Sequence, residues 1–224
     1  MQCHEPSATE PICAACRQQY FIRAQARCYQ CALPLEKLDD QSHCGECLST
    51  VPHFDRSISA CSYAPPLDQL VLGLKFMQSL AYANLMATQI AEQMRALHAI
   101  SPDLLCAVPL GPQRLIERGF NQALEIAKPL AKKLSLPLQP QLLIRLRDTL
   151  PQGHLSGKER KQNLSKAFIL NPEFLGQIEG KHIGVVDDVI TTGTSLNEIA
   201  KLLKRFGASQ VTNLVFARTS PHSF

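Results

Sequence analysis

The sequence predicts an α/β fold, in which a parallel sheet is flanked by helices and preceded by a small cysteine-rich domain. Seven of the nine cysteines lie before residue 50. Beyond residue 56, short apolar runs alternate with longer segments in which apolar residues recur every three or four positions, a pattern typical of parallel strands joined by helices. With 224 residues, 45% of them apolar, the chain is long enough to bury a core. We therefore expect two domains, residues 1–56 and 57–224.

Each element of the second domain is predicted from its local pattern. The expected strands are short apolar runs, and they cover residues 57–63, 104–110, 141–145, 167–170, 182–186 and 211–217. The expected helices have three- and four-residue apolar spacing, and they cover residues 67–76, 81–97, 121–134 and 196–206. Pro65 and Pro66 separate the first strand from the first helix, Pro129 is expected to kink or end the third helix, and Gly207 closes the last. The polar stretch between residues 145 and 167 is too long for a turn, which indicates a functional loop.

Six of the cysteines form three C-x-x-C pairs near the N-terminus. Two such pairs about a dozen residues apart are typical of a zinc ribbon, because each tight turn directs two thiolates toward one tetrahedral ion. The second and third pairs make one complete structural zinc site, and its ligands are Cys28, Cys31, Cys44 and Cys47. The first pair has only Cys3 and His4 upstream to complete a second site, whose thiolate ligands are Cys13, Cys16 and Cys3.

The remaining cysteines and the nature of the N-terminus indicate the compartment of the protein. His43 adjoins Cys44 and is an alternative ligand, although a histidine beside a ligand is more often exposed. Cys61 and Cys106 stand in apolar runs and are expected to be buried as small hydrophobic residues. The first ten residues are polar and acidic, and no apolar run reaches the ~18 residues of a membrane helix. The sequence thus predicts a cytoplasmic protein, in which metal binding explains the cysteines better than disulfides do.

Residues 185–195 read VVDDVITTGTS, an apolar run followed by two acids and a turn rich in hydroxyl groups. The turn offers backbone N–H groups and four hydroxyls at a helix start, which suits a phosphate, and its residues are Thr191, Thr192, Gly193, Thr194 and Ser195. Asp187 and Asp188 precede it, where carboxylates accept hydrogen bonds from ribose hydroxyls or hold Mg²⁺. A polar turn without a ligand is the simpler alternative, but the whole run of strand, acids, loop and helix favours a phosphosugar site.

Two basic segments are expected near this site, because ligands bind beyond the carboxyl ends of the strands in an open parallel sheet. In the first, Arg114 and Arg118 stand one helical turn apart, and two guanidinium groups suit a pyrophosphate. The second falls within residues 141–170, which contain six Lys/Arg and two Asp/Glu, a net charge of +4. Its candidate nucleic-acid contacts are Arg145, Arg147, Lys158, Arg160 and Lys161.

The order of these motifs resembles that of the ComF family, which includes ComFC and GntX. The shared pattern covers nearly the whole chain and reads VPL, R-x-x-x-RGFNQA, R-x-R-x-T-x-x-Q, R-x-x-N-L-x-x-AF and VVDDVITTGTS, behind cysteine pairs. The resemblance implies a double zinc ribbon joined to a type I phosphoribosyltransferase-like parallel sheet flanked by helices. It further implies 5-phosphoribosyl 1-pyrophosphate (PRPP) as the ligand and a role in natural competence, the uptake and handling of single-stranded DNA. The family's first pair is normally C-x-x-C, whereas here only Cys3 is present.

The resemblance also implies a role for each motif. Asp187 and Asp188 would contact the ribose hydroxyls and Mg²⁺ at the catalytic centre, and residues 191–195 would bind the 5′-phosphate. Arg114 and Arg118 follow the strand at which such enzymes bind pyrophosphate, and residues 146–160 would form a lid.

Two functions remain open at this point. As a DNA-handling protein, the chain binds PRPP or a related nucleotide as a regulator, single-stranded DNA along the basic loop, and competence proteins through its zinc domain. As an enzyme, it transfers phosphoribose to an unidentified nucleobase-like acceptor, with Mg²⁺ and arginines neutralising the pyrophosphate that leaves. The acid pair favours PRPP binding, whereas the resemblance favours a DNA process.

Overall fold

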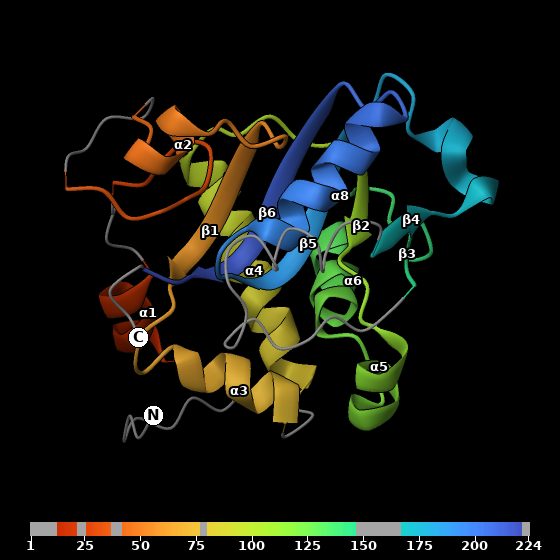
Figure 1. Cartoon of the computed structure of the whole chain (residues 1–224). Helices are drawn as coiled ribbons and strands as arrows, with labels where there is room; N and C mark the ends of the chain where they lie inside the picture. Colours follow the sequence, from red (N-terminus) through yellow and green to blue (C-terminus); the bar gives the residue numbers. More distant parts are fainter. Residues whose placement is uncertain (1–12, 22–25, 37–41, 77–79, 147–166, 221–224) are drawn as a thin grey trace.

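The computed structural model describes residues 13–21, 26–36, 42–76, 80–146 and 167–220. Their central feature is a four-stranded parallel sheet with the strand order β1-β6-β5-β2 (Figure 1). The strands are Arg56–Ser62 (β1), Leu104–Ala107 (β2), His182–Ile190 (β5) and Gln210–Arg218 (β6). The two central strands, β5 and β6, are mostly buried, as their nearly continuous apolar sequence predicts. The predicted α/β fold with a parallel sheet is therefore confirmed.

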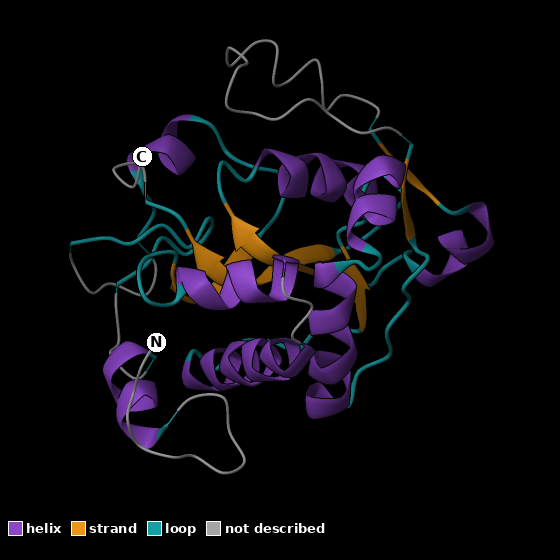
Figure 2. Ribbon diagram, turned by 90° about the horizontal axis from the view of Figure 1, so that it is seen from below, coloured by secondary structure: helices purple, strands orange, loops and turns teal. Residues whose placement is uncertain are grey.

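Helices cover both faces of this sheet. On one face, α4 (Leu80–Ala96) contacts β1 and β6, and α6 (Gln122–Leu134) contacts β5 and β2. On the opposite face, α8 (Thr194–Arg205) packs against β6 (Figure 2). Two shorter helices, α3 (Asp68–Phe76) and α5 (Pro112–Arg118), lie below the carboxyl ends of the strands in Figure 1.

The helices form where their local sequence favours them. The buried residues of α8 recur at three- and four-residue spacing, and they are Leu196, Ile199, Ala200 and Leu203. Asn121 caps α6, because its side chain accepts a hydrogen bond from the backbone N–H of Ala123 over 3.1 Å. The helix continues past Pro129 to Leu134, so Pro129 does not end it.

The strand β5 is longer than predicted and reaches Ile190 instead of ending at Val186. Its pairing with β6 continues to Ile190, which lies opposite Arg218, and the ladder of backbone hydrogen bonds holds the strand through the two acids. Asp187 and Asp188 therefore lie inside the last part of the strand, not after it. The helix α8 begins at Thr194, two residues before its predicted start.

Two of the predicted strands do not join the parallel sheet. Leu143–Arg145 (β3) and Phe168–Leu170 (β4) form a separate antiparallel pair. Parallel neighbours need a crossover connection, usually a helix, and the sequence between these runs shows no helical pattern. Arg145 thus ends a strand of the small sheet, and the expectation that residues 141–145 form a strand of the parallel sheet is wrong. The other short helical segments are α1 (Ala14–Tyr20), α2 (Gly45–Ser49) and the 3-10 helix η2 (Pro172–Gln177).

The cysteine-rich segment packs beside β1 (Figure 1), and its buried cysteines belong to the same contiguous core as the sheet. The strand β1 begins at Arg56, and the division into domains 1–56 and 57–224 stays a prediction. Cys61 and Cys106 are 3% and 0% exposed, and burial raises the pKa of each thiol to about 12, so both are buried as predicted. No helix in the described ranges is long and apolar enough to cross a membrane.

Candidate functional site

Two adjacent carboxylates lie near the carboxyl end of β5. Asp188 is 8% exposed and Asp187 is half-buried. The backbone N–H of Asp188 donates to Oδ1 of Asp187 over 2.9 Å. Burial, and after it the charge of Asp188, raises the pKa of Asp187 well above its ordinary value. Two acids held this closely in a partly buried place favour a cation beside them.

Lys75 supplies one such cation, and sequence reasoning missed it. Its Nζ lies 2.7 Å from Oδ2 of Asp188. The residue stands in the last turn of α3, far from Asp188 in the sequence. The segment has the pattern of an ordinary amphipathic helix that ends in a basic residue, so no motif or spacing points to this contact. The tertiary fold alone brings the two charges together.

The loop between β5 and α8 contains the predicted phosphate-binding residues 191–195. Gly193 has a φ of +75° and caps α8, in a left-handed conformation that glycine adopts without strain. Thr194 and Ser195 occupy the first turn of this 12-residue helix, where N–H groups without a partner inside the helix and the positive end of the helix dipole attract anions. The hydroxyl groups of Thr192 and Thr194 lie 2.7 Å apart. The structure thus has a turn suited to an anion two residues beyond the acid pair.

The two predicted pyrophosphate ligands lie on α5. Arg114 and Arg118 are both in this helix, which agrees with the predicted spacing of one helical turn. The guanidinium of Arg118 lies 5.8 Å from the centre of the Phe76 ring. Phe76 follows Lys75 at the end of α3, so Arg118 and Asp188 each contact the same end of α3. The fold therefore gathers Arg118, Lys75 and the acid pair at the carboxyl edge of the sheet.

The predicted nucleic-acid contacts are described only in part. The guanidinium of Arg145 lies 5.3 Å from the centre of the Phe168 ring, its partner in the β3–β4 pair. The other four candidates fall outside the described residues, and they are Arg147, Lys158, Arg160 and Lys161. Their role stays a prediction.

Four buried cysteines form a cluster whose chemistry fits zinc. Their Sγ atoms all lie within 4.8 Å of one another, and the residues are Cys28, Cys31, Cys44 and Cys47. Zinc–thiolate bonds of about 2.3 Å in a tetrahedron place the sulfur atoms about 3.8 Å apart, so the cluster needs only a small contraction to hold the ion. The backbone N–H of Cys44 donates to Sγ of Cys28 over 3.3 Å, a contact that stabilises a thiolate. The predicted grouping of these four cysteines is confirmed, and we call it the four-cysteine cluster.

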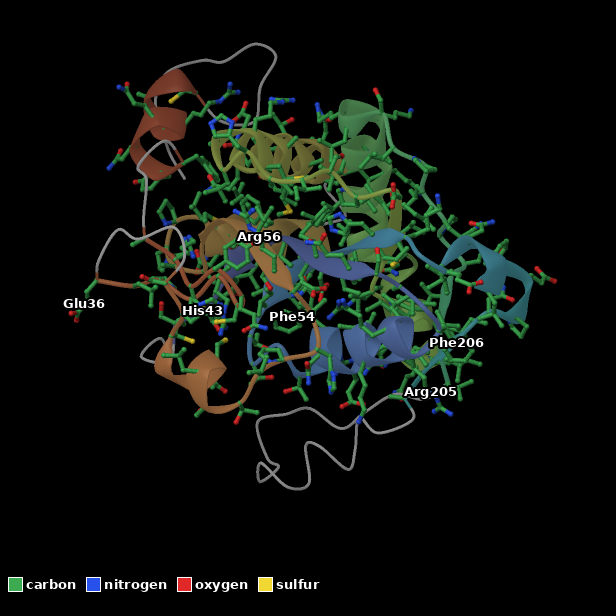
Figure 3. All side chains as sticks on the ribbon, turned by 90° about the horizontal axis from the view of Figure 1, so that it is seen from above. Glu36, His43, Phe54, Arg56, Arg205 and Phe206 are labelled. Atoms are coloured by element: carbon green, nitrogen blue, oxygen red, sulfur yellow. The ribbon has the colours of Figure 1, made fainter. Side chains whose placement is uncertain are left out.

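The other candidate ligands lie apart from this cluster. Cys13 and Cys16 are buried at the start of α1, and the backbone N–H of Cys16 is 3.5 Å from Sγ of Cys13. Because Cys3 lies outside the described residues, a second zinc site stays a prediction. The exposed ring of His43 lies beside the cysteine segment (Figure 3), with its centre 6.1 Å from that of the Tyr29 ring. His43 is not a member of the metal-binding group found among the described residues.

Comparisons with known proteins identify the family. Residues 121–221 match the phosphoribosyl transferase domain. The DNA utilization protein YhgH of Salmonella typhimurium strain LT2 is 37% identical over 212 residues, which cover 93% of this chain and 90% of that protein. Competence protein F of Haemophilus influenzae is 32% identical over 208 residues, which cover 91% of this chain and 89% of that protein. The chain belongs to the ComF family.

The order of the sequence motifs predicted that this chain belongs to the ComF family, and the comparisons confirm this prediction. Among solved structures, the glutamine PRPP amidotransferase from B. subtilis, complexed with ADP and GMP, is similar over 59% of this chain and 25% of that chain. The two are 23% identical in sequence, with a TM-score of 0.40. This ComF-family protein thus combines a phosphoribosyltransferase-type parallel sheet with an N-terminal cluster of cysteines that fits a zinc ribbon.

Proposed function

We propose that this ComF-family protein binds PRPP together with Mg²⁺ and serves in the handling of incoming single-stranded DNA during natural competence. The observation that carries the proposal is the acid pair near the end of β5, followed two residues later by the loop that caps α8. In this proposal, Asp187 and Asp188 contact the ribose hydroxyls and Mg²⁺, and residues 191–195 hold the 5′-phosphate. Arg114 and Arg118 bind the pyrophosphate.

The DNA role is supported by charge and by the relatives. Residues 141–170 carry a net charge of +4, and a dense positive segment attracts the phosphates of a strand. Residues 1–60 contain five Lys/Arg and seven Asp/Glu, so the cysteine-rich part is better suited to a protein partner than to DNA. The names of the relatives, a DNA utilization protein and a competence protein, point to the same process.

Calorimetric titration of the purified protein with PRPP, with and without Mg²⁺, tests the central part of this proposal. We expect binding that depends on Mg²⁺. The absence of any heat of binding at millimolar PRPP and Mg²⁺ would contradict it.

Replacing Lys75 by methionine should change the two ligands in opposite directions. The variant Lys75→Met removes the cation that now contacts Asp188, so Mg²⁺ alone should bind more tightly. The pyrophosphate loses a nearby positive charge, and PRPP should bind roughly tenfold more weakly, since a charge-assisted hydrogen bond contributes about 1.5–3 kcal/mol. Calorimetry measures both affinities. Lys201→Met, an exposed lysine of α8, is the matched control and should change neither.

Single-stranded DNA should bind weakly and without sequence preference through the basic segment within residues 141–170, here called the basic loop. Its affinity should fall as salt rises, with a slope of about 0.7 for each phosphate contact. Neutralising the five candidate residues should lower both the affinity and the slope, as fluorescence anisotropy can show. The matched control neutralises five exposed cations on helices, which are Arg95, Lys128, Lys132, Lys133 and Lys201. If both sets have the same effect, the basic loop does not bind DNA and any DNA role depends on a protein partner.

A cavity beside the end of β1 supports a second candidate function, the transfer of phosphoribose to an unidentified nucleobase-like acceptor. The cavity holds about 410 Å³, and its lining includes Tyr20, Phe21, Arg27, Cys61 and Gln93. In the sheet order, β1 is two strands away from β5, a separation of roughly 10 Å. Aromatic, amide and guanidinium groups suit a planar polar acceptor. Release of pyrophosphate from PRPP, measured with a panel of bases, separates an enzyme from a protein that only binds PRPP.

A further inference from the structure

The guanidinium of Arg218 is buried between the four-cysteine cluster and the loop of residues 191–195, here called the phosphate loop. Arg218 is the last residue of β6 and is 6% exposed. Its Nε–H donates to the carbonyl oxygen of Cys31 over 3.1 Å. Its Nη1 donates to the carbonyl oxygen of Ile190 over 3.2 Å and also to that of Thr191. One side chain thus joins the backbone of a cluster cysteine to the backbone at which the phosphate loop begins.

These partners differ from the usual partner of a buried arginine, which is a carboxylate. None of the ion pairs found within the described part of the chain includes Arg218. A main-chain carbonyl moves only when its backbone moves, so the guanidinium responds to the position of both segments. Residues 28–32 form a turn, here called the cysteine turn, in which the N–H of Ala32 donates to the carbonyl oxygen of Cys28. Because the N–H donors of Arg218 have a rigid planar geometry, a shift of the cysteine turn displaces the donors that hold the phosphate loop.

A second arginine, the half-buried Arg27, holds the same cysteine turn against the sheet. Nη1 of Arg27 donates to the carbonyl oxygen of Ala32 over 3.0 Å, and its Nη2 donates to Oγ of Ser62 over 3.0 Å. Burial lowers the pKa of Arg27 to about 10, and the charge of Arg218 acts in the same direction. The carbonyl groups of the cysteine turn therefore help to hold two cationic side chains that repel each other.

The cysteine-rich segment has another link to the phosphate loop, independent of Arg218. The backbone N–H of His53 donates to Oδ1 of Asn197 over 2.6 Å. Asn197 stands at the start of α8, and its own N–H donates to the carbonyl oxygen of Gly193 over 2.9 Å. Because this second link is exposed to solvent, we expect it to contribute less than the buried contact of Arg218.

We propose that Arg218 is a positioning residue through which the four-cysteine cluster holds the loop 191–195 in its ligand-binding conformation. The inference rests on the proposed binding of PRPP. Zinc keeps the carbonyl group of Cys31 in place, and this carbonyl fixes the position of the Arg218 guanidinium. The guanidinium in turn holds the carbonyl groups of Ile190 and Thr191, so the loop is ordered before the ligand binds. Zinc binding and PRPP binding then strengthen each other by the same factor, as thermodynamic linkage requires.

A coupling experiment tests this proposal. The affinity for PRPP with Mg²⁺ is measured by calorimetry on the zinc-loaded protein and after partial depletion with a chelator. The affinity for zinc is measured by competition with a chelating dye, with and without PRPP. We expect a coupling factor of roughly tenfold in both directions. The variant Arg218→Lys, which keeps the charge but cannot reach both sides at once, should lower the factor to about one. The same factor in Arg218→Lys as in the parent protein would overturn the proposal.

A matched control separates coupling from a general loss of stability. Lys204 also joins α8 to the segment that precedes β1, because its Nζ lies 2.8 Å from Oδ2 of Asp55. It stands at the end of α8 remote from the phosphate loop, next to Arg205 and Phe206 (Figure 3). Lys204→Met should lower the melting temperature but keep the coupling factor of the parent. A factor reduced equally in both variants would show that Arg218 has only a structural role.

Hydrogen exchange gives a reading that does not need PRPP. In zinc-loaded Arg218→Lys, the amides of residues 191–195 should exchange roughly tenfold faster than in the parent protein, while those of β5 stay protected. In Lys204→Met they should exchange at the parent rate. Unchanged loop exchange in Arg218→Lys overturns the role of Arg218 even if PRPP binds. Faster exchange together with no PRPP binding by the parent protein supports the link and contradicts the proposed function instead.

Discussion

Stabilisation by PRPP and Mg²⁺ is expected to disappear when Asp187→Asn and Asp188→Asn are combined. A ligand that binds only the folded state stabilises it by about 2.7 kcal/mol at 100 times its Kd, which raises the Tm of a chain of this size by roughly 5–11 °C. The two amides keep the shape of the acids but lose the negative charge that attracts Mg²⁺. Differential scanning calorimetry with and without the ligands measures the loss.

The same experiment needs a fold control and a charge control. Without ligand, the double variant should stay folded, because Asp187 is a half-buried acid whose pKa is already raised by burial and by Asp188. Glu198→Gln removes a carboxylate from α8 close to the phosphate loop and should leave the PRPP-induced rise intact. A double variant that PRPP stabilises as strongly as the parent would show that the acid pair is not part of the site.

Loss of one cluster cysteine is expected to have the largest effect on stability. The purified protein should contain one equivalent of zinc, and Cys47→Ser should lose it, because the tetrahedral set is then incomplete. Structural zinc contributes roughly 10–16 kcal/mol of binding free energy in small zinc domains, so the N-terminal segment should unfold. Elemental analysis measures the zinc, and circular dichroism with limited proteolysis measures the unfolding.

The first cysteine pair provides the matched control for this prediction. The combined change Cys13→Ser and Cys16→Ser should keep one equivalent of zinc, since both residues lie outside the four-cysteine cluster. Two equivalents in the parent protein would show that Cys3, Cys13 and Cys16 bind a second ion with a further ligand. A parent protein that is folded in this segment without any metal contradicts the zinc assignment.

The local parts of both sites were predictable from the sequence. The C-x-x-C spacing brought four cysteines together, because each pair is one tight turn and the chain between the pairs is short. The run of acids, hydroxyl residues and Gly193 indicated a turn at the start of a helix. In the structure, this turn leads into α8, with Gly193 as its N-cap. Arg114 and Arg118 share a short helix, as their spacing predicted. In each case neighbouring residues define the geometry.

The contacts that complete these sites depend on residues far apart in the chain. Lys75 reaches Asp188 only because the fold brings the end of α3 to the carboxyl end of β5. The sequence of α3 has no feature that indicates this contact. Residues 141–145 were expected in the parallel sheet, but β3 pairs with β4 in an antiparallel sheet of its own. Strand pairing is a long-range choice, and a short apolar run has the same pattern whether its partner is parallel or antiparallel.

The sequence by itself determined the α/β class, the family, the four-cysteine cluster and the turn between β5 and α8, because each is recorded in residue types at short fixed spacing. The tertiary structure decided which cations serve the acid pair and how the two sites are joined. In the sequence, Arg218 has no feature that distinguishes it from any residue at the end of a buried strand. Its link between Cys31 and Thr191 exists only because the last residue of β6 is packed between the cysteine turn and the end of β5.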